Sequence, residues 1–141
     1  MRAATSLALV CALAGLVGCG GGGGDNAKDP SAVTKAVTDY AHAFGNGDGA
    51  KACALLTPGG RDAFVKRVSS IVGTRDCAEA ISKLQSVAGP NVTGPFQDAT
   101  VSGAKTTGDK GTATLMAGGH TTTVQLEFRD GKWLLTHVPG T

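Results

Sequence analysis

The stretch that decides the fold is FQDATVSGAKTTGDKGTATLMAGGHTTTVQLEFRDGKWLLTHV, residues 96–138. Short runs that alternate apolar and polar residues are separated by three pairs typical of tight turns: Gly108-Asp109, Gly118-Gly119 and Asp130-Gly131. This spacing predicts four antiparallel strands that follow one another along the chain as a meander. Because one face of such a sheet is apolar, the segments before it must supply a cover.

The last two turns also predict how the strands pair. A two-residue turn fixes the register of a hairpin, and alternation then decides which side chains share a face. The predicted pairs are Phe128 with Trp133, Leu126 with Leu135, Val124 with His137, Ala113 with Val124, and Leu115 with Thr122. Both turns place these residues on the same, mostly apolar face. The first strand, near residues 99–105, has no settled register, and Gly103 marks a candidate bulge.

Helical segments are predicted before the sheet, over residues 30–44, 50–56, 58–72 and 77–88. Asp48, Thr57 and Asp76 stand where N-cap residues are expected. Glycine follows the third segment at Gly73, and a Gly-Pro pair follows the fourth, as is typical of helix ends.

Apolar residues recur at helical spacing within these segments. The stripes are Val33, Val37, Tyr40 and Phe44; Phe64, Val68 and Ile71; and Cys77, Ile81, Leu84 and Ala88. Residues 50–56 carry few polar side chains, which predicts a mostly buried segment. Helices followed by an antiparallel meander predict the α+β class, with N-terminal helices packed on a four-stranded antiparallel sheet as a roll.

The first residues have the features of an export signal. Arg2 precedes an uncharged apolar run, residues 7–17, that is too short to span a bilayer comfortably. The run ends in Leu16-Val17-Gly18-Cys19, which resembles the lipobox of bacterial lipoproteins. That resemblance implies cleavage before Cys19, a diacylglycerol thioether on its sulfur and usually a third acyl chain on its amine, and two or more chains anchor a protein stably. The alternative is an ordinary secretory signal in which Cys19 has no role.

This interpretation divides the chain into a signal peptide (1–18), a lipidated cysteine with a glycine-rich flexible tether (19–29) and a domain (30–141). We expect the mature protein to be exported and anchored to the outer face of the cell membrane, or to the outer membrane if the host has two. Removing residues 1–18 removes one charged residue, Arg2, so the formal net charge falls from +2 to +1. Without clustered Lys and Arg, nucleic-acid binding is not expected.

Two cysteines remain for the folded domain, since Cys11 leaves with the signal and Cys19 carries lipid. Cys53 and Cys77 each lie on a predicted helix of an exported domain, which favours one disulfide between them. The alternatives are two free buried thiols or half of a metal site. Neither cysteine has another cysteine or a histidine at metal-ligand spacing, and we expect no metal or cofactor.

Parts of the domain carry a family resemblance. The stretches are VTDYAHAF (37–44), GDGAKAC (47–53) and FRDGKWLL (128–135). They are similar to the nuclear transport factor 2-like superfamily, which includes ketosteroid isomerase and SnoaL-type proteins. The resemblance covers residues 31–139. It implies a strongly curved sheet wrapped around the first helix, as in a cystatin-like roll, with a cone-shaped cavity and often a homodimer through the sheet.

The inward faces of such a cone supply its candidate site. The candidate pocket residues are Tyr40, Phe44, Thr122, Leu126, Phe128, Trp133, Leu135 and His137, and His120 is a further inward polar residue. Trp133 against Phe128 is interpreted first as an aromatic packing pair. Glu127 points outward by the register. No catalytic set of the superfamily maps onto this sequence position by position, so an enzyme is not expected.

Three functions are compatible with these observations. The first is a non-catalytic module whose cone binds a small apolar molecule, or whose outer sheet face, residues 121–127, meets a protein partner or a second copy. The second is a structural or regulatory envelope lipoprotein without a ligand. The third and least favoured is a small isomerase or dehydratase that uses Tyr40 and His137.

Overall fold

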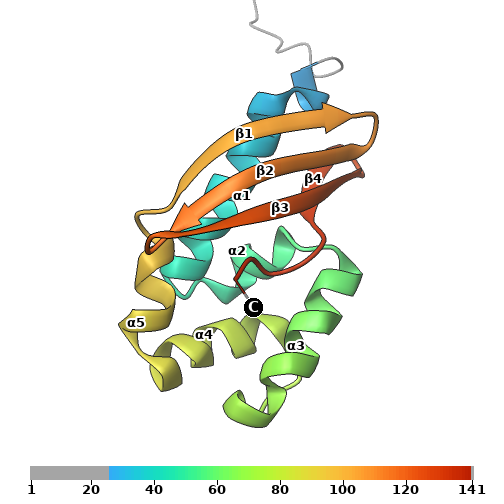
Figure 1. Cartoon of the computed structure of the whole chain (residues 1–141). Coiled ribbons are helices and arrows are strands. Elements are labelled where there is room, and N and C mark those ends of the chain that lie inside the picture. Colours follow the sequence, from blue (N-terminus) through green and yellow to red (C-terminus); the bar gives the residue numbers. More distant parts are fainter. Residues whose placement is uncertain (1–25, 141) are drawn as a thin grey trace, which may run out of the picture.

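The structure, a computed structural model, describes residues 26–140 (Figure 1). The predicted signal peptide, Cys19 and the first part of the tether lie outside the described residues. The helices are η1 (Asn26–Lys28), α1 (Pro30–Gly45), α2 (Gly49–Ala54), α3 (Pro58–Val72), α4 (Cys77–Ala88), α5 (Pro90–Thr93) and η2 (Gly94–Phe96). The strands are β1 (Thr100–Thr107), β2 (Lys110–Ala117), β3 (His120–Arg129) and β4 (Lys132–Leu135). Within residues 26–140, no helix is long and apolar enough to cross a membrane.

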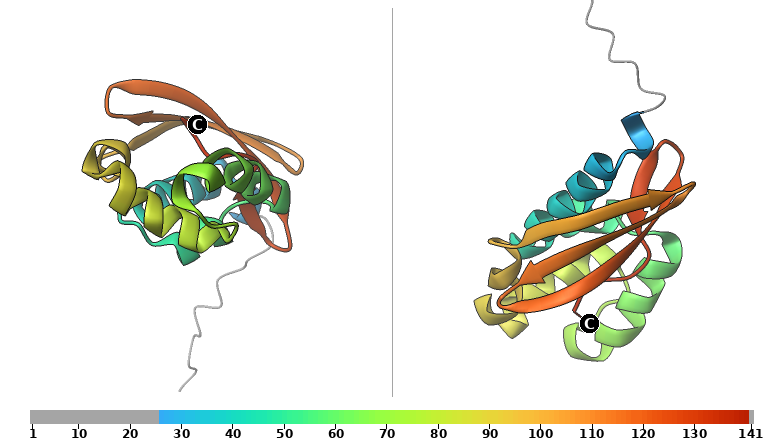
Figure 2. Two further views of the ribbon diagram at one scale, coloured as in Figure 1. Left: turned by 90° about the horizontal axis from the view of Figure 1, so that it is seen from below. Right: turned by 45° about the horizontal axis from the view of Figure 1, so that its top comes forward.

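Helices and sheet form two layers, and the curved sheet lies over α1 (Figure 2). The predicted α1 stripe is buried and supplies the centre of the core. This helix approaches the sheet closely at Gly111, where a Cβ would lie 2.9 Å from Val33 Cγ2 and 3.0 Å from the Trp133 ring. Only glycine leaves room for both side chains there. The predicted α+β class is therefore confirmed.

The sheet is an antiparallel meander in the order β1-β2-β3-β4. Four of the five predicted pairs are confirmed, on both sides of β3. The register of β1 shifts between Ser102 and Lys105, and Gly103 has a φ of 61°. The candidate bulge at Gly103 is thus present, since a positive φ there suits glycine.

The predicted pair of Val124 with His137 is wrong. Strand β4 ends at Leu135, and the chain bends at Thr136, whose N–H donates to the Gln125 carbonyl at 2.9 Å. Strand β4 also forms backbone hydrogen bonds with the connection between α2 and α3, in the helical layer. Leu135 N–H donates to the Leu55 carbonyl, and Thr57 N–H donates to the Leu135 carbonyl, both at 2.8 Å. These bonds tie the α2–α3 connection to the other edge of β4, and the bend at Thr136 ends the strand after four residues.

The three predicted N-caps are confirmed. Asp48 accepts from Lys51 N–H at 3.1 Å, Thr57 from Gly60 N–H at 3.1 Å, and Asp76 from Glu79 N–H at 2.8 Å. Each side chain satisfies a backbone donor that has no partner inside its helix.

Two details of the helices differ from prediction. Helix α2 ends at Ala54 rather than at residue 56, and its Ala50, Lys51 and Ala54 are exposed, because only one side of this short helix meets the core. In α3, Ile71 of the predicted stripe is 61% exposed, whereas its neighbour Val72 is 6% exposed. The last turn therefore buries Val72 in place of Ile71.

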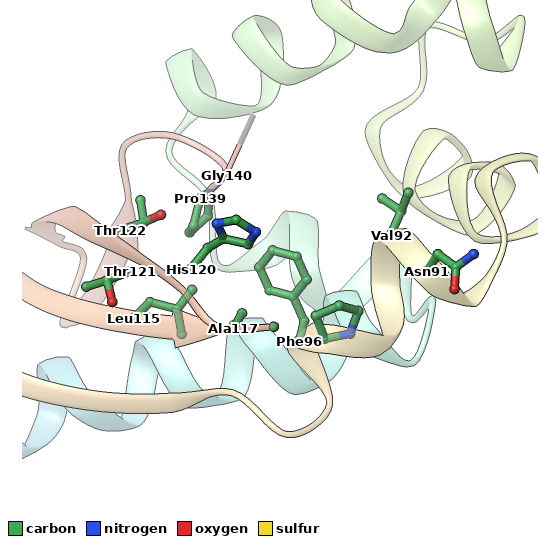
Figure 3. Close-up of a pocket in the computed structure, with 12 residues that line it drawn as sticks. Asn91, Val92, Phe96, Leu115, Ala117, His120, Thr121, Thr122, Pro139 and Gly140 are labelled. Carbon is green, nitrogen blue, oxygen red and sulfur yellow. The ribbon is translucent and has the colours of Figure 1, made fainter.

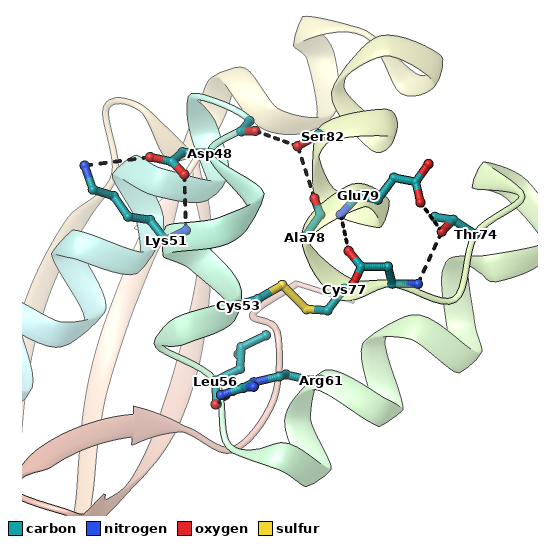
Figure 4. The surroundings of a disulfide bond; sticks show 12 residues. Asp48, Lys51, Cys53, Leu56, Arg61, Thr74, Cys77, Ala78, Glu79 and Ser82 are labelled. Carbon is teal, nitrogen blue, oxygen red and sulfur yellow. Dashed lines mark hydrogen bonds and ion pairs between the residues drawn. A yellow bond between two sulfur atoms is a disulfide. The ribbon is translucent and has the colours of Figure 1, made fainter.

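A disulfide joins Cys53 in α2 to Cys77 at the start of α4, with their Cα atoms 6.1 Å apart (Figure 4). The predicted pairing is confirmed. The helices also meet closely beside it, where a Cβ on Gly49 would clash with the Ala78 carbonyl. The disulfide therefore links two helices whose backbones already lie in close contact.

Candidate functional site

A pocket of about 620 Å³ opens at the end of the sheet where β2 turns into β3 (Figure 3). Helices α5 and η2, this turn and the last described residues of the chain surround it. The lining residues are Asn91, Val92, Pro95, Phe96, Leu115, Ala117, Gly118, His120, Thr121, Thr122, Pro139 and Gly140. Exposed side chains at its rim, such as Val92 and His120, leave the pocket accessible to solvent.

The walls of the pocket are continuous with the hydrophobic core. Leu115 is only 2% exposed and forms part of the lining from β2. The half-buried Phe96 ring packs edge-on against Phe44 of α1, with ring centres 4.9 Å apart. Phe96 is thus fixed from behind by the core while it lines the pocket in front.

The β2–β3 turn closes directly over η2. Gly118 has a φ of 57°, and a Cβ there would lie 2.9 Å from Pro95 Cβ. Both the backbone conformation and the close approach require glycine. This contact holds the turn and η2 together at one side of the pocket.

The chemistry of the lining is nearly uncharged. Among its twelve residues none is Asp, Glu, Lys or Arg, and His120 is the one imidazole. In Figure 3 the His120 and Phe96 rings both project into the space between the sheet and α5. Asn91 and Thr122 add hydrogen-bonding groups around these rings. Such a lining suits a small neutral molecule with an apolar or flat body and a few polar atoms.

The structure places most of the predicted pocket residues elsewhere. Of the eight, Thr122 lines this pocket. Five are packed in the core: Tyr40, Phe44, Leu126, Trp133 and Leu135. Phe128 packs edge-on against Trp133 with ring centres 5.3 Å apart, which confirms the predicted aromatic pair. His137 lies in the bend after β4, half-buried, with its Nδ1 3.2 Å from Thr136 Oγ1.

Tyr40 is enclosed, and its hydroxyl has no hydrogen-bond partner among the described residues. Burial raises the pKa of Tyr40 above its usual range, because a phenolate in an apolar surrounding loses its hydration. The side chain therefore stays neutral at physiological pH. Its ring stacks on Phe44 with centres 5.9 Å apart, which makes it a packing group in this structure.

The outer face of the sheet carries the predicted polar residues. Thr121, Thr123 and Gln125 are exposed. Glu127 accepts hydrogen bonds from Lys110 and Arg129, at 2.7 Å and 2.6 Å, and these bonds lower the pKa of its carboxyl group. Glu127 is thus paired with two basic side chains on this face.

Sequence reasoning missed the part of the pocket that comes from α5 and η2. Val92, Pro95 and Phe96 belong to a stretch whose prolines predict only irregular structure. The sequence predicts His120 as an inward polar residue, but alternation along one strand does not show which residues lie across the pocket from it. A packing contact between distant segments has no local signal in one sequence.

No group of His, Cys, Asp and Glu within residues 26–140 is arranged to hold a metal ion. Comparisons with known proteins give no match: no protein-family model, no curated protein and no solved structure matches this chain.

Proposed function

We propose that the protein is an exported lipoprotein whose domain binds a small neutral molecule in the pocket beside Phe96 and His120. The observation that carries the proposal is the pocket itself. Its volume of about 620 Å³ falls within the roughly 300–1,000 Å³ of small-molecule sites. Its Phe96 wall is held by the core through Phe44, and a wall fixed in advance lowers the ordering needed for binding.

The ligand class follows from the lining. With no fixed charge among the lining residues, a phosphate or a strongly charged molecule would lose hydration without gaining an ionic partner. A flat or apolar body would instead contact the Phe96 and His120 rings. Asn91 and Thr122 would hydrogen-bond its polar atoms and so select among molecules of similar size.

The lipobox resemblance supports the anchoring part of the proposal, and the helices before a curved four-stranded sheet are compatible with the nuclear transport factor 2-like superfamily. The superfamily also contains enzymes, but the pocket seen here involves neither Tyr40 nor His137. A binding module is therefore the function that the described residues support best.

Filling the pocket should abolish binding. Ala117→Phe places a ring inside the pocket, whereas Met116→Phe places the same ring on the opposite, exposed face of the same strand. With N-phenyl-1-naphthylamine, a neutral dye that brightens in apolar surroundings, wild type and Met116→Phe should give a saturable fluorescence increase. Ala117→Phe should give none while melting at a similar temperature. Equal dye binding by all three proteins would show that the dye site lies outside the pocket.

Replacing the lipobox cysteine tests the anchor. Cys19→Ala removes the sulfur that would carry the diacylglycerol, so the protein should move from the membrane fraction to the soluble extracytoplasmic fraction or keep its uncleaved signal. Fractionation with an intact mass of each form distinguishes the two results. A Cys19→Ala protein that stays membrane-bound and acylated would contradict the lipobox assignment.

A further inference from the structure

The start of the described chain is fixed to one end of the sheet. The Trp133 indole N–H donates to the Ala27 carbonyl at 2.9 Å. Next to it, Lys28 Nζ lies 2.6 Å from Asp109 and 5.1 Å from the centre of the Phe128 ring. Residues 26–28, which the sequence assigns to the tether, are therefore part of the folded unit.

The pocket lies at the other end of the same strands. The contacts of η1 are at the end of the sheet that holds the β1–β2 and β3–β4 turns, whereas the pocket is beside the β2–β3 turn (Figure 1). Strand β2 has eight residues. At about 3.3 Å per residue, the two ends of the sheet are separated by roughly 25 Å.

The chain between the lipobox cysteine and η1 is short. Only residues 20–25 separate Cys19 from Asn26. Because an extended chain spans at most about 3.3–3.6 Å per residue, this segment reaches no farther than roughly 25 Å. The end of the sheet with η1 therefore stays within that distance of the bilayer. The pocket end reaches the bilayer only if the domain lies along the surface, or if it inverts while the segment is almost fully stretched.

We infer that the anchor sets the orientation of the domain, with the η1 end of the sheet toward the membrane and the pocket away from it. The ligand then enters from the aqueous side as a dissolved or wall-borne small molecule, and is not a lipid drawn from the same bilayer. This inference rests on the proposed lipid anchor and on the pocket as the binding site.

Energy transfer from two labelled positions tests the orientation. Lys132→Cys lies at the start of β4 near η1, and Asp98→Cys lies just before β1 near the pocket, and both native side chains are exposed. The native Cys53 and Cys77 are oxidised and do not compete for the label. Each lipidated full chain is labelled with the same donor dye and reconstituted in phosphatidylcholine vesicles that carry an acceptor on the lipid headgroup.

The expected result is transfer to the vesicle several-fold stronger from residue 132 than from residue 98. Equal or reversed transfer from chains that float with the vesicles would overturn the orientation while leaving the anchor intact. Chains that do not float with the vesicles would overturn the anchor, and the orientation with it. As a control, a Gly-Ser insertion that lengthens the segment between Cys19 and Asn26 should reduce the difference in energy transfer between the two labelled positions. An undiminished difference would show that the short segment is not its cause.

Discussion

Trp133→Ala is expected to lower the free energy of unfolding by about 3–5 kcal/mol, the usual cost of removing a large aromatic side chain from a core. The indole is 3% exposed and packs against Phe128 with ring centres 5.3 Å apart. It also donates to the Ala27 carbonyl, so truncation leaves that acceptor without its partner. Both losses act at the contact between η1 and the sheet.

Chemical denaturation of the mature domain measures this effect. Lys132→Ala changes the exposed neighbour on the same strand and should stay within about 0.5 kcal/mol of wild type. Trp133→Phe keeps an aromatic ring but removes the donor, and so separates packing from the hydrogen bond. If Trp133→Ala unfolds at the wild-type denaturant concentration, the assignment of the inward face of β4 is wrong.

Removing the disulfide should have the second largest effect. Cys53 and Cys77 are 24 positions apart, and the chain-entropy model assigns roughly 3–4 kcal/mol to closing a loop of this size. The double variant Cys53→Ala, Cys77→Ala loses that constraint on the unfolded chain. It also loses part of the packing between α2 and α4, since Cys53 is buried.

Reduction provides an independent control for this prediction. Wild type treated with a reductant should show most of the loss of the double variant, whereas the double variant should not respond to the reductant. A wild-type protein with the same unfolding midpoint before and after complete reduction would contradict a stabilising role for the bond.

Much of the fold could be predicted because its signals are local. The turn at Asp130-Gly131 has its glycine at a φ of 79°, and this geometry sets the pairing of Phe128 with Trp133. The α1 stripe follows in the same way from helical periodicity, and its side chains are buried as that pattern indicates. In each case, a few neighbouring residues contain the whole signal.

The failures arise where distant segments decide the outcome. Periodicity extends the ladder to His137, but β4 ends at Leu135, where the chain bends and its other edge bonds to the α2–α3 connection. Likewise, Ile71 fits the α3 stripe, yet it is exposed, and its neighbour Val72 faces the core on that turn. The local pattern identifies both elements correctly, but the tertiary contacts that decide where each one leaves the core are not visible from the segment alone.

The candidate site was less predictable than the fold. The resemblance to a cone-shaped family points to the inner face of the sheet, but large buried side chains such as Phe44 and Leu126 occupy most of that face. The open volume lies at the end of the sheet, where η2 and the β2–β3 turn meet through Pro95 and Gly118. Their meeting depends on the path of the chain after α4.

A native mass spectrum of the protein, extracted gently from its own membranes, tests the central claim most directly. We expect the acylated chain to carry an additional, non-covalent mass of a few hundred daltons that is lost at higher collision energy. That mass should be missing from Ala117→Phe and present in Met116→Phe, since only the first variant fills the pocket. An acylated wild-type chain that repeatedly shows no additional mass, or the same mass in both variants, would contradict ligand binding at this pocket.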